Sequence, residues 1–112
     1  RQMCIRDSDN DTLNGWYNCL ANEISKSHKN NISKFLDLEN KDLHWSMIEY
    51  SLQSKAMMVI IPVQDLLGLG SESRMNTPGT ISEQNWSWRM EPDLLKDFLI
   101  KKMKLITKEA RR

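Results

Sequence analysis

Residues 60–89 read IIPVQDLLGLGSESRMNTPGTISEQNWSWR. The stretch begins at the end of an apolar run, turns through Gly68 and Gly70, and then holds Arg, Asn and two Trp residues. A loop of this composition after a buried strand is a usual place for a site, because the strand fixes the loop while the loop carries the chemistry. Tryptophan and polar amides suit sugars, which offer an apolar ring face to stack on and a polar edge to bond.

The apolar run before this loop, residues 56–62 (AMMVIIP), predicts a parallel strand buried on both faces. Met57 and Met58 face opposite sides of such a strand and have no His or Cys partner, so we expect core residues and no metal site. Leu66 and Leu67 should form a short helical turn that the glycines end.

Within the loop, Gly68 to Ser71 lacks the lysine of a phosphate loop and the third glycine of a dinucleotide fingerprint, so phosphate binding is not expected. Pro78 and Gly79 set a turn. Trp86 and Trp88 alternate across a segment predicted to be extended. At most one of them could then face a ligand, and both are assigned mainly to structure.

Helical spacing predicts four further elements. A first helix follows Thr12 and ends near His28, and a short one covers residues 32–38. A third covers residues 41–53 with Asp42 as N-cap, and its His44 and Trp45 are expected to be core or surface residues. The last helix starts at Pro92, and its inward stripe is Leu94, Leu95, Phe98, Leu99, Met103 and Ile106.

The segment Asp9-Asn10-Asp11-Thr12 reads as a loop that leads into the first helix. Composition alone favours helix capping by Thr12 or Asp11 over a catalytic role for these acids.

Both segments resemble one family, the 4-alpha-glucanotransferases (amylomaltases, or disproportionating enzymes). Residues 62–79 with Asn85-Trp86-Ser87-Trp88-Arg89 look like its C-terminal signature, and residues 9–12 with Gly15-Trp16 are similar to its His-Asp-Asn-Asp-Thr segment. The family's catalytic domain is a (β/α)8 barrel, which typically needs about 250 residues. The resemblance therefore implies an α/β fold in which residues 9–112 form the C-terminal portion of the barrel, its last strand-helix units, and are mostly helical.

The resemblance also implies site residues. Asp9 aligns with the aspartate that stabilises the transition state by bonding sugar hydroxyls, and Asn76 touches the glucan near the cleavage point. Ser8 stands where the family carries histidine. If Ser8 is natural, the chain lacks this histidine for binding the sugar; if residues 1–8 are adapter-derived, the histidine was cut off. The residues expected to structure the loop are Asp65, Arg74, Pro78 and Gly79.

The implied activity is the transfer of alpha-1,4-glucan segments between maltooligosaccharides or starch- and glycogen-derived glucans, by a retaining double displacement without a cofactor. The family's nucleophile and acid/base lie upstream of Asp9, so the chain alone should be inactive and fold poorly without the rest of the barrel. Two alternatives remain open: a relative that hydrolyses glucans, and a non-catalytic glucan-binding or interaction remnant.

Charge, apolar run length and cysteine pattern limit the partners and the cellular compartment that we expect for this chain. A net charge of +1, with both signs spread along the chain, gives no reason to expect nucleic acid as a partner. No apolar run approaches the roughly 18 residues that span a bilayer, so no membrane is expected. Cys4 and Cys19 form no metal-type or disulfide pattern, and the N-terminus lacks a signal-peptide core. We expect a cytoplasmic protein, or a plastid one in a photosynthetic source.

Residues 1–8, RQMCIRDS, resemble translated adapter sequence found at the ends of some assembled sequencing reads. They are expected to be adapter-derived or a disordered tail, and are excluded from fold reasoning.

Overall fold

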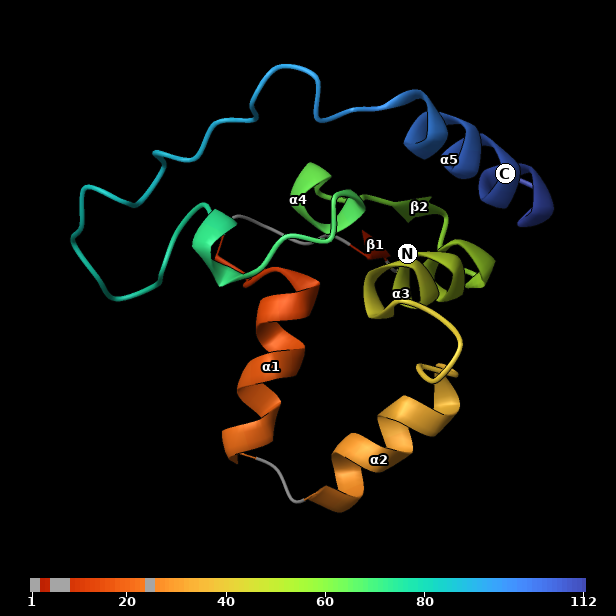
Figure 1. Cartoon of the computed structure of the whole chain (residues 1–112), viewed down its shortest axis with the longest axis horizontal. Coiled ribbons are helices and arrows are strands. Elements are labelled where there is room, and N and C mark those ends of the chain that lie inside the picture. Colours follow the sequence, from red (N-terminus) through yellow and green to blue (C-terminus); the bar gives the residue numbers. More distant parts are fainter. Residues whose placement is uncertain (1–2, 5–8, 24–25) are drawn as a thin grey trace.

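The chain is mostly helical, with one short pair of strands at its centre (Figure 1). The computed structural model describes residues 3–4, 9–23 and 26–112. In chain order the elements are β1 (Met3–Cys4), α1 (Leu13–Glu23), α2 (Lys26–Phe35), α3 (Leu43–Gln53), β2 (Met58–Val59), α4 (Val63–Leu66), the 3-10 turn η1 (Ser71–Ser73) and α5 (Asp97–Glu109).

The core lies between α3 and α5. Its buried side chains are Trp45, Ile48 and Leu52 from α3 with Leu99 and Ile106 from α5. Partly buried side chains of β2, α4 and the adjoining segments pack against this cluster. The ammonium of Lys102 lies 4.1 Å from the centre of the Trp45 ring, a cation-π contact that covers the open edge of the core.

The last residue of the chain is bonded to the end of α3 and the turn after it. The Arg112 guanidinium donates to the carbonyl oxygens of Leu52, at 2.6 Å, and of Ser54 and Ala56. These carbonyls belong to the end of α3 and the turn after it, where a helix leaves backbone acceptors unsatisfied.

β1 and β2 run parallel, with Met3 opposite Met58 and Cys4 opposite Val59. The prediction of a strand over residues 56–62 is therefore right in place but wrong in length. Met57 is 69% exposed and Met58 47% exposed, so the prediction that both are core residues is also wrong. The reason is that β2 has only the two-residue β1 beside it within the described part of the chain, so little covers its faces.

Three predicted helix boundaries are wrong. The first helix ends at Glu23 rather than near His28, which lies on α2, and the short helix expected at 32–38 is α2, which starts at Lys26 and ends at Phe35. The last helix begins at Asp97 and not at Pro92, because Asp93 takes a left-handed conformation (φ 69°) that a helix cannot contain. Leu95 and Phe98, expected on the inward stripe, are 41% and 61% exposed.

Other predictions are confirmed. The third helix covers Leu43–Gln53, with Asp42 at the N-cap position and Trp45 in the core. α4 ends at Leu66 with Leu67 as its C-cap, and Gly68 follows with a φ of 68° that suits glycine. Pro78 and Gly79 form a turn. Of the predicted tail, residues 1–2 and 5–8 lie outside the described residues, and Met3–Cys4 form β1.

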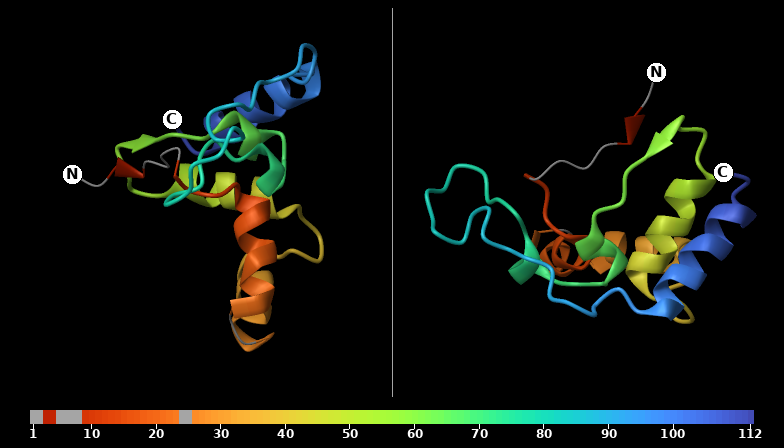
Figure 2. Two further views of the ribbon diagram at one scale, coloured as in Figure 1. Left: turned by 90° about the vertical axis from the view of Figure 1, so that its left-hand side faces the viewer. Right: turned by 90° about the horizontal axis from the view of Figure 1, so that it is seen from above.

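Between η1 and α5 the chain makes a long excursion without helix or strand, and Figure 1 and the right-hand view of Figure 2 show it looping away from the rest. This excursion starts beside the N-terminal end of α1 (Figure 1). The two segments singled out from the sequence therefore meet at one place.

Candidate functional site

The candidate site forms where the loop before α1 meets the loop after η1. The side-chain amide of Asn76 donates to Asp9 Oδ1 at 2.6 Å, although the two residues lie 67 positions apart. Both residues were predicted as substrate contacts, and the structure brings them into direct contact.

Arg74 fastens the same two loops. Its Nε donates to the carbonyl oxygen of Asn76 at 2.7 Å, and one terminal nitrogen donates to the carbonyl oxygen of Asp9. Its other terminal nitrogen lies 3.9 Å from Asp11 Oδ2. The planar guanidinium can serve several acceptors at once, which a lysine could not do in this geometry. Arg74 thus bonds the loop that carries Asn76 to the loop that carries Asp9 and Asp11.

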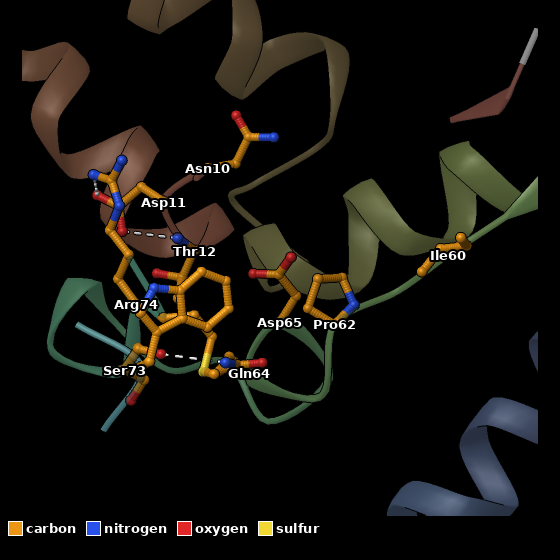
Figure 3. Close-up of a pocket in the computed structure, with 11 residues that line it drawn as sticks. Asn10, Asp11, Thr12, Ile60, Pro62, Gln64, Asp65, Ser73 and Arg74 are labelled. Carbon is orange, nitrogen blue, oxygen red and sulfur yellow. Dashed lines mark hydrogen bonds and ion pairs between the residues drawn. The ribbon is translucent and has the colours of Figure 1, made fainter. Parts of the chain in front are cut away.

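Asp11 lies between Arg74 and the start of α1 (Figure 3). Its carboxylate accepts from the hydroxyl of Ser71 at 2.8 Å and from the backbone N–H of Thr12 at 2.7 Å. The sequence suggested only a possible helix cap for Asp11. Its contact with η1 spans 60 residues, so no local signal could have indicated it.

Asp65 anchors the first helix to the loop. It is 2% exposed, and its Oδ1 accepts from the backbone N–H of Leu13, the first residue of α1, at 2.7 Å. Thr12 acts as the N-cap, because its hydroxyl accepts from the backbone N–H of Gly15 and its carbonyl from that of Trp16. A carboxylate is favoured at this position, since the N-terminal end of a helix carries a partial positive charge.

A cavity of about 300 Å³ opens between these elements (Figure 3). Its polar wall includes Asp11, Arg74 and Asp65, and Pro62 supports it on the β2 side. Gln64 closes the base by donating to the carbonyl of Ser73 at 3.3 Å. The full lining is Asn10, Asp11, Thr12, Ile60, Pro62, Gln64, Asp65, Ser73, Arg74, Met75 and Trp86.

Asp9, Pro78 and Gly79 stand outside the cavity lining. All three are exposed, and Asp9 reaches the site through Asn76 and Arg74. Pro78 and Gly79 shape the excursion that follows.

The prediction of an extended segment with alternating tryptophans is wrong. Residues 83–87 form turns, and Trp86 adopts a left-handed conformation with φ of 63°. Trp86 lines the cavity, whereas Trp88 lines a separate hollow. Arg89 donates to the carbonyls of Trp86 and Trp88 at 3.0 and 2.9 Å.

The side chain of His44 lies beside the loop that follows α4. Its ring lies against Gly68, where an added Cβ would come within 2.8 Å of the imidazole, so the loop can pass over α3 only because residue 68 is glycine. Burial lowers the pKa of His44 from its usual 6.5; Asp42 and Asp65 oppose the shift, and Lys102 adds to it. The imidazole is therefore held in its neutral form.

Among the residues that the structure describes, no cluster of three or more His, Cys, Asp or Glu side chains could hold a metal ion. The helices described are all too short or too polar to cross a membrane. The chemistry that the site offers comes from carboxylates, amides, a guanidinium and an indole.

Comparison with known proteins gives a consistent result. A family model described as 4-alpha-glucanotransferase matches residues 3–96. The 4-alpha-glucanotransferase of Synechocystis is 42% identical over 100 residues, covering 88% of this chain and 19% of that protein. The chloroplastic/amyloplastic 4-alpha-glucanotransferase of Solanum tuberosum is 46% identical over 83 residues, covering 73% of this chain and 14% of that protein.

A solved structure agrees with the sequence matches. The amylomaltase from Streptococcus agalactiae in complex with acarbose superposes with a TM-score of 0.83 at 27% identity, covering 95% of this chain and 21% of that one. This chain spans less than a fifth of the length of the two curated relatives described above.

Proposed function

This chain belongs to the 4-alpha-glucanotransferase family, and we propose that it forms the C-terminal part of the catalytic (β/α)8 barrel of an enzyme that transfers alpha-1,4-glucan segments. The observation that carries the proposal is the 2.6 Å hydrogen bond between Asn76 and Asp9, which joins the two family motifs at one site. The cavity beside this contact is mainly apolar, and its several hydrogen-bonding groups and one exposed tryptophan are of the kind that bind sugars.

Asp9 is proposed as the residue that stabilises the transition state. As the glycosidic bond breaks, the sugar ring flattens and gains oxocarbenium character, and hydrogen bonds from its hydroxyls to a carboxylate then strengthen. Asn76 and Arg74 fix Asp9 from its side chain and its backbone, so the carboxylate does not have to reorganise during the reaction. Asn76 is also proposed to contact the glucan.

The covalent steps need groups from the rest of the barrel. A nucleophilic carboxylate there would attack the anomeric carbon while a carboxylic acid protonates the departing oxygen, giving a glycosyl-enzyme intermediate. A hydroxyl of a second glucan would then attack that carbon, return its proton to the acid/base and release the nucleophile, which retains the configuration. The substrates proposed are maltooligosaccharides and starch- or glycogen-derived glucans, and no cofactor is involved.

The large radius of gyration and an apolar hollow against β2 and α1 support the proposal that the rest of the barrel is required. The radius of gyration is 15.0 Å, whereas a compact domain of this length has about 13 Å. A second, mainly apolar hollow of about 320 Å³ lies against β2 and α1, lined in part by Leu13, Trp16 and Ile48. Strands and helices of the remaining barrel would fill this space.

The relatives also bear on location. The Solanum tuberosum relative is named as chloroplastic/amyloplastic, and a cyanobacterial relative is among the matches. We place the parent protein in the cytoplasm, or in a plastid if its source is photosynthetic.

The test is a chimera in which this chain replaces the segment of the Synechocystis enzyme that it matches. On maltotriose the chimera should release glucose together with maltopentaose and longer chains, as transfer requires. Glucose and maltose without longer products would indicate the hydrolytic alternative. Glucan binding without turnover would favour the non-catalytic remnant.

A further inference from the structure

Trp86 is the large aromatic side chain on the wall of the site cavity, and the proposed mechanism does not use it. Its indole is 55% exposed and lines the same cavity as Asp11 and Arg74. Trp88, two residues later, is less exposed and lines a separate hollow with Ser71 and Thr80. The two tryptophans of the motif therefore differ in environment.

The backbone of Trp86 is strained. Its φ of 63° lies in the left-handed region, which is unfavourable for a bulky side chain. Asp37, Asp93 and Arg111 also have positive φ. Aspartate tolerates this conformation through local hydrogen bonds, and Arg111 follows the C-cap of α5, where helices commonly end in a left-handed residue. Such strain persists only where the surroundings impose it, and it concentrates at functional sites.

Hydrogen bonds of the backbone hold this conformation. The N–H of Trp86 donates to the carbonyl of Met75 at 2.6 Å, and its carbonyl accepts from Arg89 at 3.0 Å. Asn85 ties the preceding turn by accepting from the N–H of Thr77 and donating to the carbonyl of Thr80, both at 3.1 Å. The backbone that carries the indole is thus held in place, while more than half of the residue's surface is exposed.

We propose that Trp86 is a substrate-binding residue whose indole stacks on the apolar face of a glucose ring of the glucan in this cavity. A sugar ring presents C–H groups on its faces and hydroxyls at its edge, so the indole would take one face while Arg74 and Asp11 bond the edge. This inference rests on the proposed function and adds a specificity residue to it.

The test replaces Trp86 by glycine in the chimera. Trp86→Gly removes the ring and also relieves the backbone, because glycine adopts positive φ without strain. We expect the midpoint of thermal unfolding to stay the same or rise, while the affinity for acarbose measured by calorimetry falls about tenfold, or roughly 1.4 kcal/mol. Trp86→Phe should lose less affinity, and Trp88→Phe, the matched control, should bind acarbose as the wild type does.

The outcomes separate the two proposals. If Trp86→Gly binds acarbose as tightly as the wild type while the wild-type chimera transfers glucan, the stacking role is wrong and the proposed function stands. A lower unfolding midpoint in Trp86→Gly also overturns the stacking role, since the ring would then be packed against protein. A wild-type chimera that neither transfers glucan nor binds acarbose overturns both.

Discussion

Asp9 is the residue on which the proposed chemistry depends, and two other residues set its position. The amide of Asn76 holds one carboxylate oxygen and Arg74 holds the backbone carbonyl, so side chain and main chain are both fixed. Hydrogen bonds to a charged acceptor are stronger than neutral ones, about 1.5–3 kcal/mol each. A site built in this way would lose activity when a supporting amide is removed, even with the carboxylate intact.

We therefore expect Asn76→Ala in the chimera to lower kcat/KM for maltotriose by roughly 10- to 100-fold, the equivalent of one charge-assisted hydrogen bond. The initial rate of glucose release measures the effect. Asn18→Ala is the matched control, because Asn18 is an exposed amide on α1 away from the site, and it should keep the wild-type rate. Equal rates in Asn76→Ala and Asn18→Ala would contradict the proposed role of Asn76.

His44 gives a prediction for pH. Burial lowers its pKa in the folded state below 6.5, so on acidification the unfolded chain takes up the proton first. The stability contributed by neutral His44 is thus present above about pH 6.5 and is lost as the pH falls toward the folded-state pKa.

In the chimera, thermal unfolding at pH 7 and pH 5 should show a smaller loss of stability for His44→Gln than for the wild type. His28→Gln provides the comparison, because His28 is exposed on α2 and its replacement should leave the wild-type pH dependence in place. A His44→Gln protein that loses as much stability on acidification as the wild type would refute the assignment.

At the scale of elements, the start of α1 is the structural support of the site. Asp65 reaches across 52 residues to the first N–H of the helix, and Thr12 caps the next turn. The start of α1, which follows the loop that carries Asp9, is therefore fixed to α4 by a buried carboxylate.

Asp65→Ala should destabilise the chimera by about 1.5–3 kcal/mol, the range for a hydrogen bond to a charged group. The reason is that the backbone N–H of Leu13 loses its acceptor. The midpoint of thermal or denaturant unfolding reports the loss. Asp65→Asn keeps an acceptor oxygen in place and should lose less. If Asp65→Ala unfolds at the wild-type midpoint, the carboxylate does not anchor α1.

The sequence was sufficient for elements with local signals. α3 follows from its apolar stripe, the end of α4 from Gly68, and the cap of α1 from Thr12. The family's motifs, and not spacing, assigned Asp9 and Asn76 to the same glucan, and the direct contact between the two residues was not predicted. Among the residues of the site, local sequence signals indicated those that lie beside turns and helix caps.

Other boundaries had no local signal. Asp37 and Asp93 take left-handed conformations at the end of α2 and before α5, positions where glycine would have marked a break. Trp86 does so within the excursion, which no propensity indicates for a bulky residue. The length of β2 depends on neighbouring strands, and the described residues offer only β1.

At the scale of the whole molecule, much apolar surface remains uncovered. Ile60 of the β2 segment is 44% exposed, and Phe98 and Leu105 of α5 are 61% and 56% exposed. Isolated exposed apolar residues are normal, but several on a strand and helix that flank one small core indicate a missing neighbour.

The chain on its own should therefore show no sharp, cooperative thermal transition by circular dichroism, and limited proteolysis should cleave it within residues 77–96. The same residues should resist cleavage in the chimera, where the rest of the barrel covers the core. A sharp cooperative melt of the 112-residue chain would show that it folds independently and would contradict the requirement for the barrel.

The central claim is that this chain supplies a transition-state carboxylate to a glucan-transferring barrel. Its most direct test is the kcat of maltotriose disproportionation by the chimera with Asp9→Asn, which keeps the size of the side chain and removes its charge. We predict a fall in kcat of at least roughly 100-fold, with an unchanged unfolding midpoint and acarbose still bound. A kcat within a few-fold of the wild-type chimera would contradict the claim.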